Sequence, residues 1–362
     1  MDIVLEAADA YLFDYVYAKL FPVPQAVAAL IQTAGPSTDL VTSLAKNLSL
    51  SYIPTQPYKT TIFTAPPTAY LSTVPRDNII RESISLFLLV WIFGIVLYFL
   101  FASLSYAFIF DKRTMNHPKY LKNQMRMEIT QAMSSMPWMS LYTVPWFVFE
   151  VKGYSMLYWD PNEYPKSYLF WQFPLFIAFT DFGVYLIHRG LHHPFIYKHL
   201  HKPHHKWIVP TPYASHAFHP VDGYLQSLPY HIFPFVFPLH KFSYLLLFTF
   251  INIWTILIHD GEYMTNNPAI NGAACHTIHH LYFNYNYGQF TTLWDRIGGS
   301  YRLPEASLFD HSAKMSKSTW DSQSKEMEKI VKTVEDTDDR TYASPASAAP
   351  VSAAPVETKK QK

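Results

Sequence analysis

Three short segments of this chain hold eight of its seventeen histidines. We call them the histidine boxes, and they are His188-x3-His192, His201-x2-His204-His205 and His276-x2-His279-His280. Spacings of three and four residues place side chains on one face of a helix, aimed at a common point. Neutral imidazole is the commonest protein ligand for first-row metals, and one tetrahedral ion takes about four ligands. Eight clustered imidazoles therefore predict a site that holds two metal ions.

Histidines outside the boxes differ in how well they are placed to join this site. His259 directly follows the last long apolar run of the chain, and we expect it to be a ninth ligand. His219 and His216 are weaker candidates for the same role. Of the other histidines, His193 and His199 are expected to face away from the site and His117 to have a surface role. His231, His240 and His311 are expected to be structural.

Three aspartates are candidates for hydrogen bonds to the ligand histidines: Asp181, Asp222 and Asp260. Asp181 lies inside an apolar run, where a carboxylate is energetically costly and usually marks function. A carboxylate bonded to a ligand histidine fixes the tautomer of the ring and raises its basicity. The alternative for Asp181 is a structural hydrogen bond to a neighbouring helix. Carboxylates near the boxes, including Glu262 and Asp295, would also offset the positive charge of two ions.

The identity of the metal does not follow from the ligands alone. Nitrogen ligands suit iron, copper and zinc alike. Zinc has no redox chemistry, so a site that activates oxygen would use iron. The single cysteine, Cys275, excludes a disulfide within the chain and a cysteine-based zinc or iron–sulfur site. A net charge of +1 gives no indication of a nucleic-acid partner.

The composition is that of a membrane protein. Of the 362 residues, 49% are hydrophobic and only 15% charged, against about 25% charged in soluble domains. Since about 20 apolar residues cross a bilayer, four runs with at most one formal charge each are candidate spans: residues 83–110, 129–149, 167–187 and 223–258. The last run is long enough for a hairpin, with a proline-rich first limb that could be kinked or re-entrant. We expect an all-α integral membrane protein with about four to five transmembrane helices.

Basic residues in short loops indicate the orientation in the membrane. The loop after the first run carries five basic residues and is expected to be cytosolic: Lys112, Arg113, Lys119, Lys122 and Arg126. Residues 152–166 carry basic residues only at their ends and fit the lumen. Counting onward places all three boxes and the C-terminus in the cytosol. The boxes would thus form a helical cap at the mouth of the membrane bundle, where a lipid-soluble substrate can enter.

The chain divides into three predicted regions. Residues 1–80 form an N-terminal lumenal or interfacial region, 81–310 the membrane domain with the boxes, and 311–362 a polar cytosolic tail. The tail is rich in alanine, proline and serine and is expected to be disordered from about residue 336. Its last residues, Lys359-Lys360-Gln361-Lys362, resemble a di-lysine signal for retrieval to the endoplasmic reticulum. We expect no cleavable signal peptide at the start, because no basic segment precedes an apolar core there. Asn47-Leu48-Ser49 is a glycosylation sequon that is usable only if the N-terminal region is lumenal.

The boxes resemble those of the fatty acid hydroxylase/sterol desaturase superfamily of membrane di-iron oxidases. Longer phrases between residues 76 and 310 are similar to the fungal sterol C5-desaturases within it. The phrases are Asn116-His-Pro-Lys-Tyr-Leu-Lys-Asn-Gln124, His201-Lys-Pro-His-His-Lys-Trp207, Ser215-His-Ala-Phe-His-Pro-Val-Asp-Gly223, His280-Leu-Tyr-Phe-Asn-Tyr-Asn-Tyr-Gly-Gln-Phe290 and Leu293-Trp-Asp-Arg-Ile-Gly-Gly-Ser-Tyr-Arg302.

This resemblance implies an O2-dependent Δ7-sterol 5(6)-desaturase of ergosterol biosynthesis in the endoplasmic reticulum membrane. It implies two non-haem iron ions held by the eight box histidines, with His259 as the further ligand. Electrons would come from NAD(P)H through cytochrome b5 and its reductase, as separate proteins because this chain shows no fused haem module. The aromatic segment 282–290 would line the sterol cleft, pack beneath it or anchor the chain at the membrane interface.

Two other functions are compatible with the boxes. A hydroxylase or C4-methyl oxidase of the same superfamily would use the same metal chemistry and form an alcohol, but the longer phrases favour desaturation. A non-catalytic metal-binding membrane protein, such as a zinc transporter or sensor, belongs to another class. Transport sites usually lie near the bilayer midplane between broken helices, whereas these boxes are expected in cytosolic segments.

Overall fold

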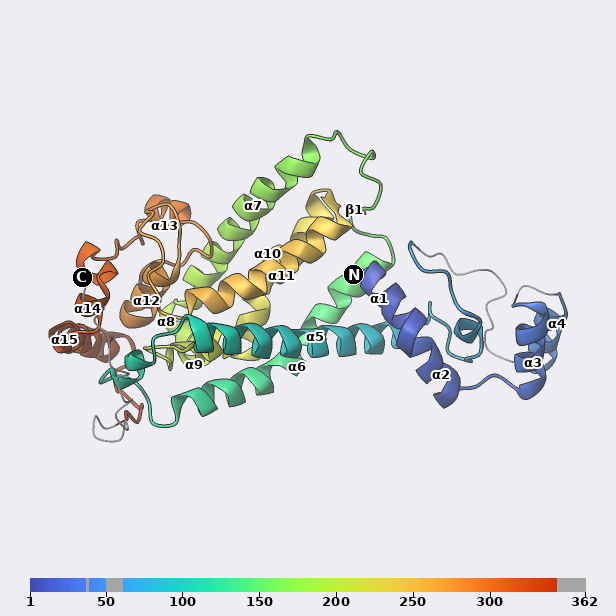
Figure 1. Cartoon of the computed structure of the whole chain (residues 1–362), viewed down its shortest axis with the longest axis horizontal. Coiled ribbons are helices and arrows are strands. Elements are labelled where there is room, and N and C mark those ends of the chain that lie inside the picture. Colours follow the sequence, from blue (N-terminus) through green and yellow to red (C-terminus); the bar gives the residue numbers. More distant parts are fainter. Residues whose placement is uncertain (37–38, 50–60, 344–362) are drawn as a thin grey trace, which may run out of the picture. The chain divides into compact units, whose positions relative to one another are not determined.

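The computed structural model describes residues 1–36, 39–49 and 61–343. The described chain is mostly helical, which confirms the predicted fold class (Figure 1). Its contacts define two compact units, which we call unit 1 and unit 2. Unit 1 comprises Met1–Phe99, Met133–Gly183 and Pro220–Ile253, and unit 2 comprises Leu100–Ala132, Val184–His219 and Trp254–Lys362.

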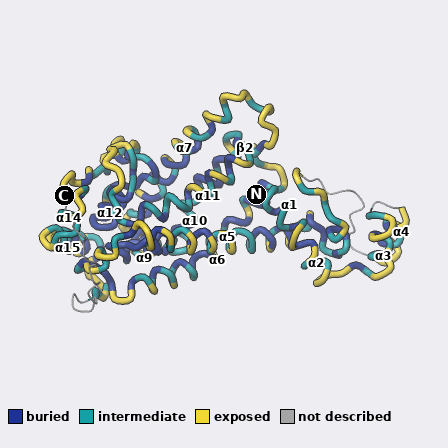
Figure 2. Tube along the Cα trace, viewed as in Figure 1, coloured by how far each residue is buried: buried dark blue, intermediate teal, exposed yellow. Residues whose placement is uncertain are grey.

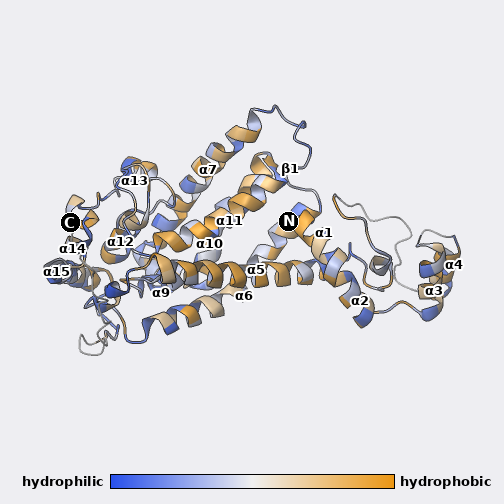
Figure 3. Ribbon diagram, viewed as in Figure 1, coloured by the Kyte–Doolittle hydropathy of each residue, from blue (hydrophilic) through white to orange (hydrophobic). Residues whose placement is uncertain are grey.

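Three helices of the described residues are long and apolar enough to cross a membrane. They are α5 (Ile79–Phe108), α7 (Tyr168–Leu191) and α11 (Lys241–Ile258), and apolar residues run along each of them (Figure 3). By these helices the chain is a multi-pass membrane protein. A helix pairs most of its backbone groups internally, which is what a water-free bilayer core requires.

The other predicted spans are also helical, but one is less apolar and the other is shorter than the three helices above. Helix α6 (Gln124–Val151) has 28 residues but contains several polar side chains and two internal prolines, Pro137 and Pro145. Helix α10 (Pro220–Val236) has 17 residues, and at 1.5 Å per residue it reaches about 26 Å, short of a hydrocarbon core of about 30 Å. Pro229 and Pro234 lie inside α10, as expected for a kinked limb.

Unit 1 also contains the short N-terminal elements α1 (Asp2–Ala8), η1 (Asp9–Phe13), α2 (Asp14–Leu20), α3 (Gln25–Ala34), α4 (Asp39–Asn47) and η2 (Pro67–Tyr70). Buried ion pairs connect η1 and α2 to the start of α5. The Arg81 guanidinium lies 2.9 Å from Asp9 and 2.6 Å from Asp14, which also pairs with Arg76. Two short parallel strands, β1 (Leu157–Tyr158) and β2 (Leu239–His240), pair within the same unit.

Helices α7 and α10 approach closely at a glycine of unit 1. A methyl group on Gly183 would lie 2.6 Å from Cγ and 2.8 Å from Cβ of Pro229. Because Gly183 has no side chain, the ring of Pro229 packs directly against the α7 backbone.

Unit 2 is built from short elements around a buried helix. They are η3 (Lys112–Asn116), α8 (Pro194–Ile196), η4 (Tyr197–His201), α9 (Lys202–His205), η5 (Pro212–His216), α12 (Ala273–Tyr282), α13 (Leu293–Ile297), η6 (Ala306–Phe309), α14 (His311–Lys314) and α15 (Lys317–Val334). Helix α12 is buried along almost its whole length (Figure 2).

Helix α15 supports α12 through an apolar stripe. Its N-terminus is capped by Ser316, whose Oγ accepts from the Thr319 amide at 3.2 Å. Met327 and Val331, one turn apart, are buried in the same hydrophobic cluster as Ile278 and Leu281 of α12. Burying these side chains holds α12 in place, since each buried side chain contributes about 1.5–3 kcal/mol to the free energy of folding.

The segment after α15 returns to the start of α6. Tyr342 forms an isolated antiparallel bridge with Leu121, and the Arg340 side chain is buried against Glu335. The structure describes this segment up to residue 343. The rest of the tail for which we predict disorder, with the lysines at 359 and 360, lies outside the described residues.

Candidate metal centre

The three histidine boxes lie on or beside different helical elements of unit 2. His188 is in the last turn of α7 and His192 follows the end of that helix. His201 ends the π-helical turn η4, and His204 and His205 are in α9, where Pro203 occupies a first-turn position that needs no amide donor. The third box lies on α12, and His259 directly follows α11.

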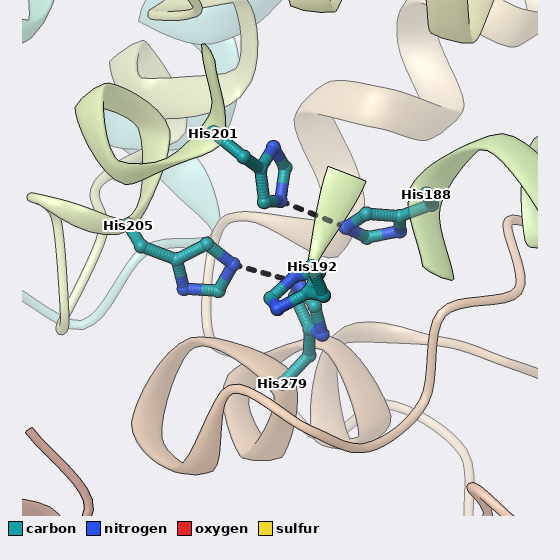
Figure 4. A group of neighbouring side chains, drawn as sticks. All are labelled: His188, His192, His201, His205 and His279. Atoms are coloured by element: carbon teal, nitrogen blue, oxygen red, sulfur yellow. Dashed lines mark hydrogen bonds between the residues drawn. The ribbon is translucent and has the colours of Figure 1, made fainter. Parts of the chain in front are cut away.

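Five of these histidines form one group: His188, His192, His201, His205 and His279. Each offers a ring nitrogen, and these atoms lie within 4.8 Å of one another (Figure 4). The Nε2 atoms of His188 and His201 are 3.1 Å apart, and those of His205 and His279 are 3.0 Å apart. The first group therefore combines residues of all three boxes.

The other four form a second group: His204, His259, His276 and His280. The Nε2 atom of His276 lies 2.9 Å from that of His259 and 3.1 Å from that of His280. The Nε2 atoms of His259 and His204 are 3.4 Å apart. The two groups thus contain the eight box histidines and His259, whereas His216 and His219 belong to neither among the described residues.

These distances fit ligands around metal ions. A metal–nitrogen bond of about 2.0–2.1 Å places neighbouring ligand atoms about 2.9–3.4 Å apart in octahedral or tetrahedral geometry. Moreover, Nε2 of His192 is buried without a hydrogen-bond partner within the described residues, although a buried polar atom normally has one. The donor set therefore fits two nitrogen-ligated ions.

Comparison with known proteins shows the relationship of this chain. The profile of the fatty acid hydroxylase family matches residues 173–300, which contain all nine histidines. A probable Delta(7)-sterol 5(6)-desaturase of Neurospora crassa is 57% identical over 94% of this chain and 97% of its own length. The Delta(7)-sterol 5(6)-desaturases of Aspergillus fumigatus and Saccharomyces cerevisiae are 58% and 54% identical, over 96% and 94% of this chain and 99% and 97% of their own lengths.

The chain belongs to the Δ7-sterol 5(6)-desaturase family. This confirms the resemblance that the boxes and the longer phrases indicate. No solved structure is detectably similar to it.

Backbone carbonyls determine the tautomers of three histidines in this desaturase site. The Nδ1 atom of His188 lies 2.9 Å from the Tyr287 carbonyl oxygen, that of His279 2.8 Å from the Tyr285 oxygen, and that of His259 2.6 Å from the Thr255 oxygen. A carbonyl can only accept, so each Nδ1 carries the proton. The Nε2 atom of each ring then presents its lone pair to the group.

Burial keeps the imidazoles uncharged. It holds the pKa values of His204, His205, His276, His279 and His280 well below their usual range, and the proximity of the rings to one another adds to the effect. Burial also lowers the pKa of His259 to about 3. Uncharged rings have free lone pairs at neutral pH, which is the form that binds metal.

Aromatic rings cover both groups. The Tyr287 ring lies 4.9 Å from the His192 ring and 5.5 Å from the His188 ring, measured between centroids. Phe283 stacks on His205 at 4.9 Å, and Phe218 lies 4.4 Å from His204. Within the predicted aromatic segment, Phe283 and Tyr287 thus pack against the histidines, where they exclude water from the ring nitrogens.

The three predicted aspartates are all buried. Asp260 belongs to unit 2, where it accepts from the Glu262 amide at 2.8 Å and from Ser105 at 3.4 Å, and burial raises its pKa to about 7. Asp181 and Asp222 belong to unit 1, and Asp222 accepts from Gln226 at 2.8 Å. Hydrogen bonds donated by ligand rings to these carboxylates remain a prediction. The carbonyl acceptors of the site were not predicted, because every residue has a carbonyl and the sequence does not mark which ones face a ring.

Proposed function

We propose that this protein introduces the C5=C6 double bond into a Δ7-sterol, with O2 as the oxidant. The observation that carries the proposal is the family membership, at more than half identity over nearly the whole chain. The two histidine groups support it, because the reaction needs a redox-active centre and the groups can hold two ions.

We infer that the five-histidine group holds one iron and the four-histidine group the other, with His259 in the second set. Iron suits these nitrogen ligands and, unlike zinc, changes its oxidation state. When bound, the iron pair supplies the redox chemistry by which two sterol hydrogens, two further electrons and two protons reduce O2 to water.

The protein's own residues would bind the ions, orient the ligand rings and shield the site from water. Uncharged imidazoles provide the lone pairs, and the Tyr285, Tyr287 and Thr255 carbonyls fix three rings in the metal-binding tautomer. The aromatic cover around the rings keeps bulk water away, which protects a reactive oxidant from side reactions. The hydrogens removed are those at C6, allylic to the existing double bond, and at C5.

The partners and location follow from the same proposal. The sterol reaches the site from membrane lipid, as the three apolar helices allow. Electrons come from NAD(P)H through cytochrome b5 and its reductase. The protein lies in the endoplasmic reticulum membrane with the boxes and the C-terminus in the cytosol, residues 1–80 lumenal or interfacial and 81–310 as the catalytic domain. The basic loop between α5 and α6 supports this orientation.

The test is expression in cells that lack their own C5-desaturase. Extracted sterols are scanned in the ultraviolet with and without oxygen, and a conjugated 5,7-diene is expected only when both the chain and oxygen are present. His204→Ala should abolish the diene, whereas His199→Ala, an exposed neighbour outside both groups, should not. A hydroxysterol in place of the diene would refute desaturation and indicate the hydroxylase chemistry.

A further inference from the structure

One loop supplies carbonyls to two histidines that come from different helices. We call residues 283–290 the carbonyl loop. Its Tyr285 carbonyl accepts from Nδ1 of His279 on α12, and its Tyr287 carbonyl accepts from Nδ1 of His188 on α7. Both histidines belong to the five-histidine group. The direction of these two carbonyls therefore decides where two of the five Nε2 lone pairs point.

The carbonyl loop has an irregular backbone. Phe283 has φ 61° and Asn286 has φ 57°, both in the left-handed region that non-glycine residues rarely adopt. A loop of this kind lacks the repeated hydrogen bonds of a helix. Its carbonyls keep their directions only if other groups hold the backbone.

Asn286 is one such group, and its side chain is buried. Its Nδ2 donates to the Cys275 carbonyl at 3.2 Å and to the Arg302 carbonyl at 3.0 Å, and its Oδ1 accepts from the Arg302 amide at 3.0 Å. Its own amide donates to the Ser300 carbonyl at 2.9 Å. These bonds connect the middle of the carbonyl loop to α12 on one side and to residues 300–302 on the other.

Asp295 in α13 is the second group, and it is fully buried. Its Oδ1 accepts from the Tyr287 amide at 2.9 Å and from Ser300 Oγ at 2.7 Å, and its Oδ2 accepts from the Gly288 amide at 2.8 Å. Hydrogen bonds from backbone amides to an ionised carboxylate are among the stronger ones in proteins. The carboxylate thus holds the two peptide units that flank Tyr287, and the second of these contains the Tyr287 carbonyl.

Gly288 allows this close approach. A methyl group at this position would lie 2.5 Å from the Thr291 carbonyl oxygen and 3.1 Å from Asp295 Oδ2. No side chain fits there without moving the backbone.

We propose that Asp295 and Asn286 are positioning residues of the metal centre. They hold the Tyr285 and Tyr287 carbonyls where each accepts from Nδ1 of one histidine, and so aim the Nε2 lone pairs of His279 and His188 at the same ion. The inference rests on the proposed ligand assignment. It concerns the five-histidine site alone, because His259 of the other site is fixed by the Thr255 carbonyl instead.

The deciding variant is Asp295→Asn. It keeps the shape of the side chain but places an NH2 donor against a backbone amide donor, so one of the two amide bonds is lost. The purified full-length protein, stripped of metal, is titrated with Co²⁺, and bound metal is counted by elemental analysis. Loss of a group that orients a ligand typically weakens metal binding by about 10–100-fold. We expect this loss for one of two ions, with the other unchanged.

Glu128→Gln is the matched control. Glu128 is also a fully buried carboxylate of unit 2, where it accepts hydrogen bonds from Thr211 and Gln124, neither of which belongs to the carbonyl loop. Both substitutions replace a buried carboxylate with its amide, so a general loss of stability would appear in both variants. We expect Glu128→Gln to bind both ions with the affinity of the unsubstituted protein.

Asn286→Asp provides a second, independent variant if too little Asp295→Asn folds. Aspartate tolerates the left-handed backbone but lacks the Nδ2 donors to Cys275 and Arg302. The same selective loss of one ion is expected. If both variants bind two ions with unchanged affinity, or if the control loses metal equally, the inference is wrong while the proposed function stands. If the unsubstituted protein binds no metal, the ligand assignment itself fails, and the inference with it.

Discussion

The Nε2 atoms of His259 and His276 lie 2.9 Å apart, although His276 lies on α12 and His259 directly follows α11. His276 is the first residue of the third box, whereas His259 lies outside every box. Together with His204 and His280, these two residues form a group of four ring nitrogens that lie within 4.8 Å of one another.

His259→Ala is therefore expected to be as damaging as the loss of a box histidine. One of four ligands disappears from the second group, so 5,7-diene formation should fall below detection while the protein remains in the membrane. The measurement is the sterol spectrum together with the amount of protein in the membrane fraction. His216→Ala, which removes a histidine outside both groups, should retain activity. Full activity of His259→Ala would contradict the four-ligand assignment.

Two glycines of α7 should respond to alanine in opposite directions. Alanine at Gly183 would collide with Pro229, and overpacking of this kind typically costs about 1–3 kcal/mol. Alanine at Gly190 meets no atom of the described residues within 4 Å, and it should stabilise the helix by up to about 1 kcal/mol. Thermal unfolding of the purified variants in one detergent measures both. Equal melting temperatures would show that α7 and α10 do not pack as described.

Arg340→Met should destabilise the protein strongly. Its guanidinium pairs with the buried Glu335 at 2.8 Å and donates to the His205 carbonyl at 3.0 Å. Removing one partner of a buried ion pair typically costs about 3–5 kcal/mol, because the other charge stays buried. The melting temperature should fall accordingly.

Lys198→Met is the comparison for that variant. Lys198 pairs with Asp336 at 3.0 Å, but both side chains are largely exposed. Exposed ion pairs contribute about 0–1 kcal/mol, so this variant should melt close to the unsubstituted protein. A small effect in both variants would mean that the segment after α15 does not depend on the buried pair.

His117 is buried and not at the surface as predicted, because its ring packs against Trp320. We therefore expect it to make the protein less stable in mild acid. Burial lowers its pKa to about 4, with the charge of Lys119 acting in the same direction, whereas an unfolded histidine titrates near about 6.5. The unfolded chain then binds more protons, so stability is present above about pH 6.5 and is lost as the pH falls towards 4. Between pH 7 and 5 the loss from this residue is about 2 kcal/mol.

His117→Asn isolates this effect. The Asn side-chain oxygen can replace His117 Nδ1, which accepts from the Lys119 amide at 3.1 Å. When the pH is lowered from 7 to 5, the melting temperature of the variant should fall less than that of the unsubstituted protein. An identical pH dependence of the two proteins would show that His117 stays accessible to protons.

The sequence by itself determined the helical membrane fold, the three boxes and the family. These features are local: a run of apolar residues demands a helix in a bilayer, and a three- or four-residue spacing places histidines on one face. His259 was also within reach of the sequence, because it ends an apolar run. The ordered segment up to residue 343 was not, since its polar composition gives no sign that Arg340 is buried beside Glu335.

Only the tertiary structure decided how the nine histidines divide between the five-histidine group and the four-histidine group. His204 and His205 are neighbours, but adjacent residues of a helix point about 100° apart, so one enters each group. The third box is divided in the same way, with His279 in the first group and His276 and His280 in the second. The tertiary structure also selected the Tyr285 and Tyr287 carbonyls and gave Asp295 its amide partners. Backbone groups are the same at every residue, so only packing in three dimensions determines which of them meets a histidine ring.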